Sequence, residues 1–129
     1  MKRIAIKTNK RVELVNITSH VRAAVKESGV RSGVCHVFVP HTTAGVTINE
    51  GADPDVARDI EERLSKLIPE NDGYRHKEGN SDAHIKSVLA GASASILVEG
   101  GVLILGTWQA VYFCEFDGPR SREVLVKVQ

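Results

Sequence analysis

Short runs of alternating apolar and polar residues recur along this chain and constrain its fold more than any other feature. Most of these runs are separated by only a few turn-forming residues, which favours antiparallel pairing because parallel strands need long crossovers. With the helices described below, the order is two strands, a helix, two strands, two helices and four strands. This order predicts an α+β fold with a mainly antiparallel, sandwich-like sheet flanked by helices. The strand-like runs are 3–7, 12–17, 33–39, 44–49, 95–99, 102–105 and 123–128, together with the long apolar run 110–116.

The clearest helix follows Asp53, a favourable N-cap residue, and has Pro54 at its first position. Pro69 marks its end. Its apolar residues recur at helical spacing, so we expect them to form a buried stripe. That stripe consists of Val56, Ile60, Leu64 and Leu67.

Two shorter helices are also expected. One should be capped by Thr18 or Ser19 and end at Gly29. The other should be capped by Ser81 or Asp82 and run to about residue 90, with an apolar face turned inward. That face consists of Ile85, Val88 and Leu89.

Composition narrows the class of protein. At 129 residues the chain fits one domain, spanning 1–129, that can bury a real core. A formal net charge of +1 gives no electrostatic case for binding nucleic acid or an anionic membrane. Cys35 and Cys114 lie in strand-like runs without a CxxC spacing, which indicates reduced, buried thiols and a cytoplasmic location.

Three of the five histidines lie in polar segments where a strand or helix begins or ends: His41, His76 and His84. Neutral imidazole is a common metal ligand, and three histidines with an open position form a recurrent catalytic zinc site. The spacing matches no dense metal motif such as HExxH. Separate surface or capping histidines therefore remain the alternative.

Acidic residues near these histidines are candidates for moving a proton. Glu50 and Asn49 end a strand at the mouth of a turn, where Glu50 could be a general base or either could orient an imidazole. Asp82 is a second candidate, although it also has an explanation as a helix cap. Glu115 lies within an apolar strand, and a carboxylate there needs a partner or a metal.

Other residues could contact a ligand. The segment Thr107-Trp108-Gln109 interrupts an apolar hairpin with the only tryptophan, which could stack on a flat ligand or anchor the core or an interface. Arg120 and Arg122 flank a tight turn and could pair with Glu115, a phosphate or a carboxylate.

Several segments together resemble the YjbQ-like family, which has been linked to a secondary thiamine phosphate synthase activity. The resemblance covers nearly the whole chain. The first matching segment runs from His41 to Glu50 and reads HTTAGVTINE. The others are DPDV at 53–56, NSDAHIK at 80–86, GTWQ at 106–109 and EFDGPR at 115–120.

The resemblance implies an α+β, sandwich-like fold assembled as a homotrimer. It also implies a divalent metal, zinc in the first instance, held by His41, His76 and His84. The other site residues that we assign are catalytic Glu50, Asp82 and Arg120, and substrate-binding Asn49, Asn80, Trp108, Gln109 and Glu115.

Three functions stay open at this point. The first is a metal-dependent enzyme acting on phosphorylated heterocyclic substrates, for which a thiamine phosphate synthase-type transfer would also need magnesium. The chain has no glycine-rich phosphate loop and no dense acidic cluster for magnesium, so the synthase reaction is expected to be a side activity. The second is hydrolysis by a zinc-activated water. The third is a non-enzymatic trimer that binds a metabolite or metal.

Overall fold

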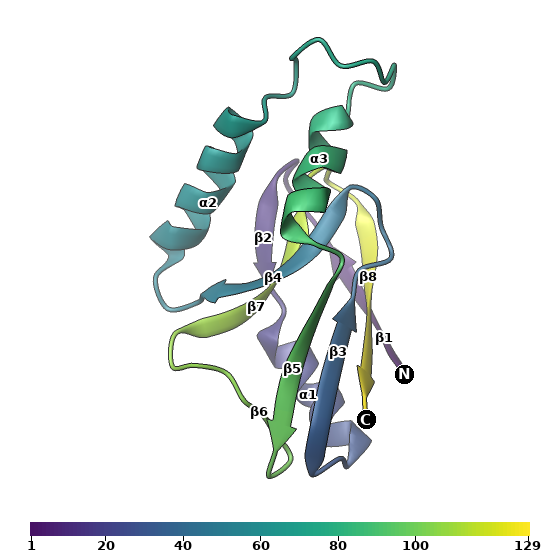
Figure 1. Ribbon diagram of the computed structural model, residues 1–129, viewed down its shortest axis with the longest axis vertical. Coiled ribbons are helices and arrows are strands. Elements are labelled where there is room, and N and C mark those ends of the chain that lie inside the picture. The colour runs from purple at the N-terminus through teal and green to yellow at the C-terminus, as the bar shows by residue number, and fades with distance from the viewer.

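The computed structural model describes all residues from 1 to 129 and arranges eight strands and three helices in layers (Figure 1). Each predicted run overlaps one strand, and the bounds differ by a few residues. The strands are β1 (Lys2–Lys7), β2 (Glu13–Asn16), β3 (Ser32–Phe38), β4 (Ala44–Glu50), β5 (Ser93–Glu99), β6 (Val102–Leu103), β7 (Gln109–Glu115) and β8 (Ser121–Val128). The helices are α1 (Thr18–Ser28), α2 (Pro54–Leu67) and α3 (Ser81–Ala90).

The strands form two sheets, and every pairing between them is antiparallel. A five-stranded sheet has the order β1-β8-β3-β5-β6, and a three-stranded sheet has the order β2-β7-β4. The hairpin between β5 and β6 turns at Gly100 and Gly101, which both adopt positive φ as its two-residue turn requires. The predicted α+β class is therefore confirmed.

The main core lies between the two sheets and is completed by Val21, Ala24 and Val25 of α1. A second, smaller core on the other face of the three-stranded sheet includes Ala83 of α3 and Phe116. Because apolar groups cover both faces of this sheet, every residue of β7 after Gln109 is buried. This double coverage explains why the β7 sequence lacks simple alternation.

The predicted caps are confirmed in part. The Asp53 side chain accepts a hydrogen bond from the Asp55 amide at 2.9 Å, and Pro54 opens α2 as expected. Gly29 ends α1 in the left-handed conformation. Thr18 does not cap α1, because it is already the first residue of the helix, and its hydroxyl donates to Asn16 Oδ1 at 2.6 Å.

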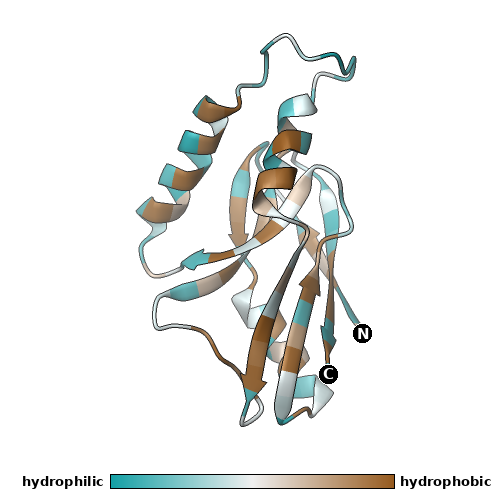
Figure 2. Ribbon diagram, in the orientation of Figure 1, coloured by the Kyte–Doolittle hydropathy of each residue, from teal (hydrophilic) through white to brown (hydrophobic).

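Helix α2 departs from its predicted burial. None of its residues is fully buried, and Leu67 keeps 67% of its surface exposed. In Figure 1 the helix stands to one side of the sheets, and Figure 2 shows apolar bands alternating with polar ones along it. The expected apolar stripe exists, but this chain covers it incompletely.

Helix α3 presents the opposite face from the predicted one. It buries Asp82, Ala83 and Lys86 and exposes its apolar residues, with Val88 81% accessible. The prediction was wrong because Lys86 Nζ donates to Asp82 Oδ2 at 2.8 Å, which allows the two charges to enter the interior together. The exposed apolar residues are Ile85, Val88 and Leu89.

Both cysteines are buried and free, as expected, and burial raises the pKa of the Cys114 thiol to about 12. None of the three helices has the length and apolar character needed to cross a membrane.

Candidate functional site

The largest cavity has a volume of about 1030 Å³ and lies where the β3–β4 connection, the α2–α3 loop, the start of α3 and the β7–β8 turn meet. All three predicted histidine ligands line it. So do the predicted catalytic Arg120 and the predicted substrate-binding Asn80. The histidines and arginines that line it are His41, Arg75, His76, His84, Arg120 and Arg122.

The three histidines share the pocket without converging on one point. The rings of His76 and His84 are neighbours, with centroids 5.7 Å apart in an edge-to-face arrangement. His41 makes a separate contact, because its Nε2 accepts a hydrogen bond from the Glu123 amide at 3.0 Å. No three histidine, cysteine or acidic side chains are grouped so that they could hold one metal ion.

Burial lowers the pKa of His41, and the nearby Arg122 charge lowers it further. The negative charges of Glu123 and Glu115 oppose this effect without cancelling it. His41 is therefore neutral at pH 7.

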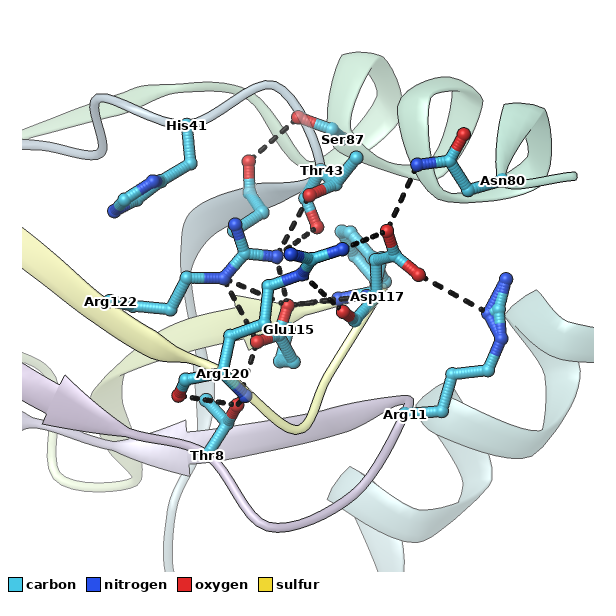
Figure 3. A network of polar contacts seen from close by, with 12 residues as sticks. Thr8, Arg11, His41, Thr43, Asn80, Ser87, Glu115, Asp117, Arg120 and Arg122 are labelled. Atoms are coloured by element: carbon cyan, nitrogen blue, oxygen red, sulfur yellow. Dashed lines mark hydrogen bonds and ion pairs between the residues drawn. The ribbon is translucent and has the colours of Figure 1, made fainter. Parts of the chain in front are cut away.

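Arg122 is fixed below the pocket by the fully buried Glu115, as Figure 3 shows. Its Nε donates to Glu115 Oε1 at 2.9 Å, and its Nη2 donates to the Glu115 carboxylate and to Thr43 Oγ1. Glu115 also accepts the Thr8 hydroxyl at 2.7 Å and the amides of Phe116 and Asp117. The carboxylate has no capacity left for a ligand, so it acts on the pocket through Arg122.

A second carboxylate, Asp117, binds two residues that line the cavity. It accepts hydrogen bonds from Asn80 Nδ2 at 2.9 Å and from Arg120 Nη2 at 3.0 Å. Burial alone would raise the pKa of Asp117, but these contacts and the Arg120 and Arg11 charges hold it below its usual range. Asp117 thereby orients two residues that face the cavity.

The α2–α3 loop forms the outer wall of the cavity and contributes Tyr74, Arg75 and His76. Tyr74 is tied within the loop, because its hydroxyl donates to the Pro69 carbonyl at 2.6 Å. Gly73 and Gly79 flank this segment with positive φ values of 67° and 80°. Arg75 forms no ion pair within the chain, so its charge is available to a ligand.

Comparison with known proteins supports the resemblance found in the sequence. The model of a protein family described as UPF0047 protein YjbQ-like matches residues 2–129. The chain belongs to the YjbQ/UPF0047 family. It is 58% identical to UPF0047 protein MJ1081 of Methanocaldococcus jannaschii, with 95% of this chain and 89% of that protein covered. It is 52% identical to UPF0047 protein YugU of Bacillus subtilis, with 99% and 98% covered.

Solved structures of YjbQ-like proteins show the same fold. A crystal structure of a YjbQ/UPF0047 protein from Clostridium acetobutylicum matches with a TM-score of 0.99 and 53% identity, and all of both chains is covered. A YjbQ-like protein of unknown function from Sulfolobus solfataricus matches with a TM-score of 0.95 at 32% identity, covering 98% of this chain and 94% of that one.

In this YjbQ-family chain, four other predicted site residues lie at the far end of β4. Glu50 ends that strand and pairs with Gln109 of β7, while Ala44 at the pocket end pairs with Glu115. Six residues of strand separate the two ends by about 20 Å. One chain therefore does not unite all the candidates. The distant group is Asn49, Glu50, Trp108 and Gln109.

Asp82 also lies outside the cavity. Its side chain is 1% exposed and is paired with Lys86 and with Arg11, whose Nη2 donates to Asp82 Oδ1 at 3.0 Å. This geometry fixes the inner face of α3 and leaves no open oxygen to move a substrate proton.

Three further lining residues were not predicted from the sequence: Thr43, Tyr74 and Arg75. Thr43 could have been predicted, because it lies two residues after His41 in the same connection before β4. Tyr74 and Arg75 lie in a polar loop that carries no periodicity, so only the fold places them.

We expect the free energy of unfolding to decrease as the pH falls below about 4. The Glu115 pKa is held low because hydrogen bonds from Arg122, Thr8 and Asp117 outweigh the raising effect of burial, and the pKa of Asp117 is low as well. A depressed folded pKa contributes stability that is present above the unfolded pKa and lost as the pH falls through the folded pKa. His41 adds a change of the same sign below its unfolded pKa of about 6.5.

Urea unfolding across this pH range measures the effect. The Glu115→Gln variant, which lacks one of the two carboxylates, is expected to show a shallower pH dependence. A stability that stays constant down to about pH 3 would contradict the assigned pKa directions.

Proposed function

We propose that this protein is a small enzyme that binds a phosphorylated heterocyclic molecule in the histidine- and arginine-lined cavity. The observation that carries the proposal is the charge of that lining. Three arginines and three histidines surround the cavity, and Glu78 is the only carboxylate among them. Guanidinium groups bind phosphate through paired, charge-assisted hydrogen bonds, which makes a phosphate-bearing ligand the best match.

The size and pre-organisation of the cavity support the same proposal. Its volume of about 1030 Å³ suits a small metabolite rather than a lone ion. Arg120 and Arg122 are held by Asp117 and Glu115 before any ligand arrives. A ligand therefore loses little free energy to ordering these side chains.

The metal implied by the resemblance does not fit all three histidines in this conformation. His76 and His84 are neighbours, but the His41 lone pair is already used by the Glu123 amide. We propose a divalent metal, with zinc as the first candidate and magnesium as the second. Only the His76–His84 pair supports such a site. No reaction step is assigned to it.

Elemental analysis of the untagged protein is the measurement that tests the metal. If the pair holds zinc, His84→Ala is expected to lose the ion with little change in thermal stability, because His84 is only half-buried. His20→Ala, on the exposed face of α1, is the control that should keep it. Full metal content in His84→Ala, or its outright unfolding, would contradict a functional site there.

We also propose a homotrimer as the working form. A closed ring of three copies joins two different faces of each copy. This chain exposes two apolar faces, one on the helices and one around β5 and β6. Ile85 belongs to the first face and to the cavity lining, so a partner seated there would extend the pocket wall. The faces are Leu67, Ile85, Val88 and Leu89, and then Leu97, Val102, Ile104 and Trp108.

A second candidate function is non-enzymatic binding of a metabolite in the cytoplasm. It is favoured by the position of Glu50 and Asp82, because neither proposed proton-moving carboxylate reaches the cavity of its own chain. Hydrolysis by a metal-bound water keeps less support, since it requires the complete metal site.

A thermal-shift comparison tests the main proposal. Inorganic phosphate, pyrophosphate and phosphorylated heterocycles, including a pyrimidine pyrophosphate and a thiazole phosphate, are expected to raise Tm, whereas the unphosphorylated heterocycles are not. Turnover of the phosphorylated compounds then separates an enzyme from a binding protein. Equal Tm shifts with and without the phosphate would contradict the proposed substrate class.

A further inference from the structure

The hydrogen bond of His41 determines what this side chain offers to the cavity. His41 follows β3 at the pocket mouth, and its Nε2 accepts from the Glu123 backbone amide at 3.0 Å. An amide N–H can only donate, so Nε2 must carry the lone pair. A neutral imidazole has one such nitrogen and one N–H. The proton therefore resides on Nδ1, and no lone pair is left for a metal.

Arg122 presents a second donor beside it. Its Nε and Nη2 are engaged with Glu115 and Thr43, whereas its Nη1 makes no hydrogen bond within the chain. Nη1 is absent from the buried, unpartnered side-chain atoms, so it reaches the cavity that Arg122 lines. Figure 3 shows this nitrogen without a dashed line, on the side of the guanidinium that faces His41.

We propose that His41 Nδ1–H and Arg122 Nη1 together form a phosphate-binding floor in the cavity, and that His41 is a hydrogen-bond donor to substrate rather than a metal ligand. This inference rests on the proposed function and assigns the group that holds the phosphate. One neutral and one charged donor beside each other suit a phosphoryl oxygen, which accepts from both. The backbone of Glu123 positions the first donor, and the side chain of Glu115 positions the second.

Two substitutions at His41 separate the donor from the structural contact. In His41→Gln, the amide oxygen can replace Nε2 as acceptor for the Glu123 N–H, but no donor remains near Nδ1. In His41→Asn, the amide nitrogen lies near the Nδ1 position and can donate to the ligand. The first variant should fold normally and fail to hold phosphate, and the second should rescue binding.

Calorimetric titration with inorganic phosphate and pyrophosphate is the first measurement. Relative to the wild type, His41→Gln is expected to bind about 10-fold to 100-fold more weakly, as for loss of a hydrogen bond to a charged group. His41→Asn should recover most of that affinity, and His20→Ala, on the exposed face of α1 and outside the cavity, should bind within about twofold of the wild type. Nitrogen NMR of the imidazole should show His41 in the Nδ1–H form.

The outcomes are distinguishable. If the wild type binds phosphate and His41→Gln binds it equally well, the phosphate-binding floor is wrong while the proposed function stands. An Nε2–H form of His41 would overturn the donor assignment in the same way. A wild type that binds neither anion would overturn both the inference and the proposed function.

Discussion

Replacing Glu115 with Gln is expected to lower the free energy of unfolding by about 3–5 kcal/mol, because it leaves the Arg122 charge buried without its counter-ion. Glu115 is 0% exposed and accepts hydrogen bonds from Arg122, Thr8 and two backbone amides. An amide oxygen can replace only part of that set, and its NH2 group faces donors. The loss should appear in urea unfolding at neutral pH as a lower midpoint.

Glu123→Gln on β8, the next strand along the chain, is the matched control. Glu123 pairs with Arg3 at 3.0 Å, but the Arg3 side chain is 61% exposed and that of Glu123 is 40% exposed, so the expected loss is below about 1 kcal/mol. Replacing Glu115 and Arg122 together by Leu and Met should recover much of the stability lost by the single substitution. Equal losses in Glu115→Gln and Glu123→Gln would show that the buried pair does not stabilise the fold as inferred.

Placing a charge on the outer face of α3 is expected to convert the proposed trimer into single chains. Val88→Arg puts a guanidinium at the most exposed apolar position of that face. Association through this face would bury the charge without a partner, which costs free energy. Fold stability of the single chain should barely change, because this chain does not cover Val88. Light scattering should report a mass near 14.0 kDa for the variant and three times that for the parent.

Ala23→Arg is the control for this substitution, because it adds the same charge to an exposed position of α1. It should leave the mass unchanged. If Val88→Arg retains the mass of the parent, the α3 face is not the interface. A parent that is already a single chain would contradict the trimer itself.

The sequence predicted most strands from the alternation of an inner and an outer face, and β7, which is buried on both faces, from its continuous apolar run. The buried faces of the helices were harder to predict. Apolar spacing identified the stripe of α2 and the face of α3, but the spacing alone does not say what covers them. In α3 the charged residues Asp82 and Lys86 turn inward as a pair, which inverts the usual rule.

The site was predictable where a residue type has few alternatives. A carboxylate in the apolar β7 strand needed a partner, and Arg122 was among the two arginines considered for it. The histidines were expected to share a site, and they do share a cavity. Their individual contacts depend on backbone groups, such as the Glu123 amide facing His41, which no residue pattern reports.

The two walls of the cavity differ in how freely they can change. Arg122 is joined through Glu115 to Thr8 and to the backbone that follows β7, so most substitutions there would lower stability as well as binding. The opposite wall is the α2–α3 loop, in which the Tyr74 hydroxyl donates to the Pro69 carbonyl and Glu70 forms an ion pair with Arg11. Insertions or exchanges in that loop could alter which ligand the proposed site accepts at little cost in folding. The architecture thus separates the part that selection must retain from the part that it can vary, and an engineer who wishes to retarget this protein should begin at loop residues 71–73 and 77–79, leaving Arg75 and His76 in place.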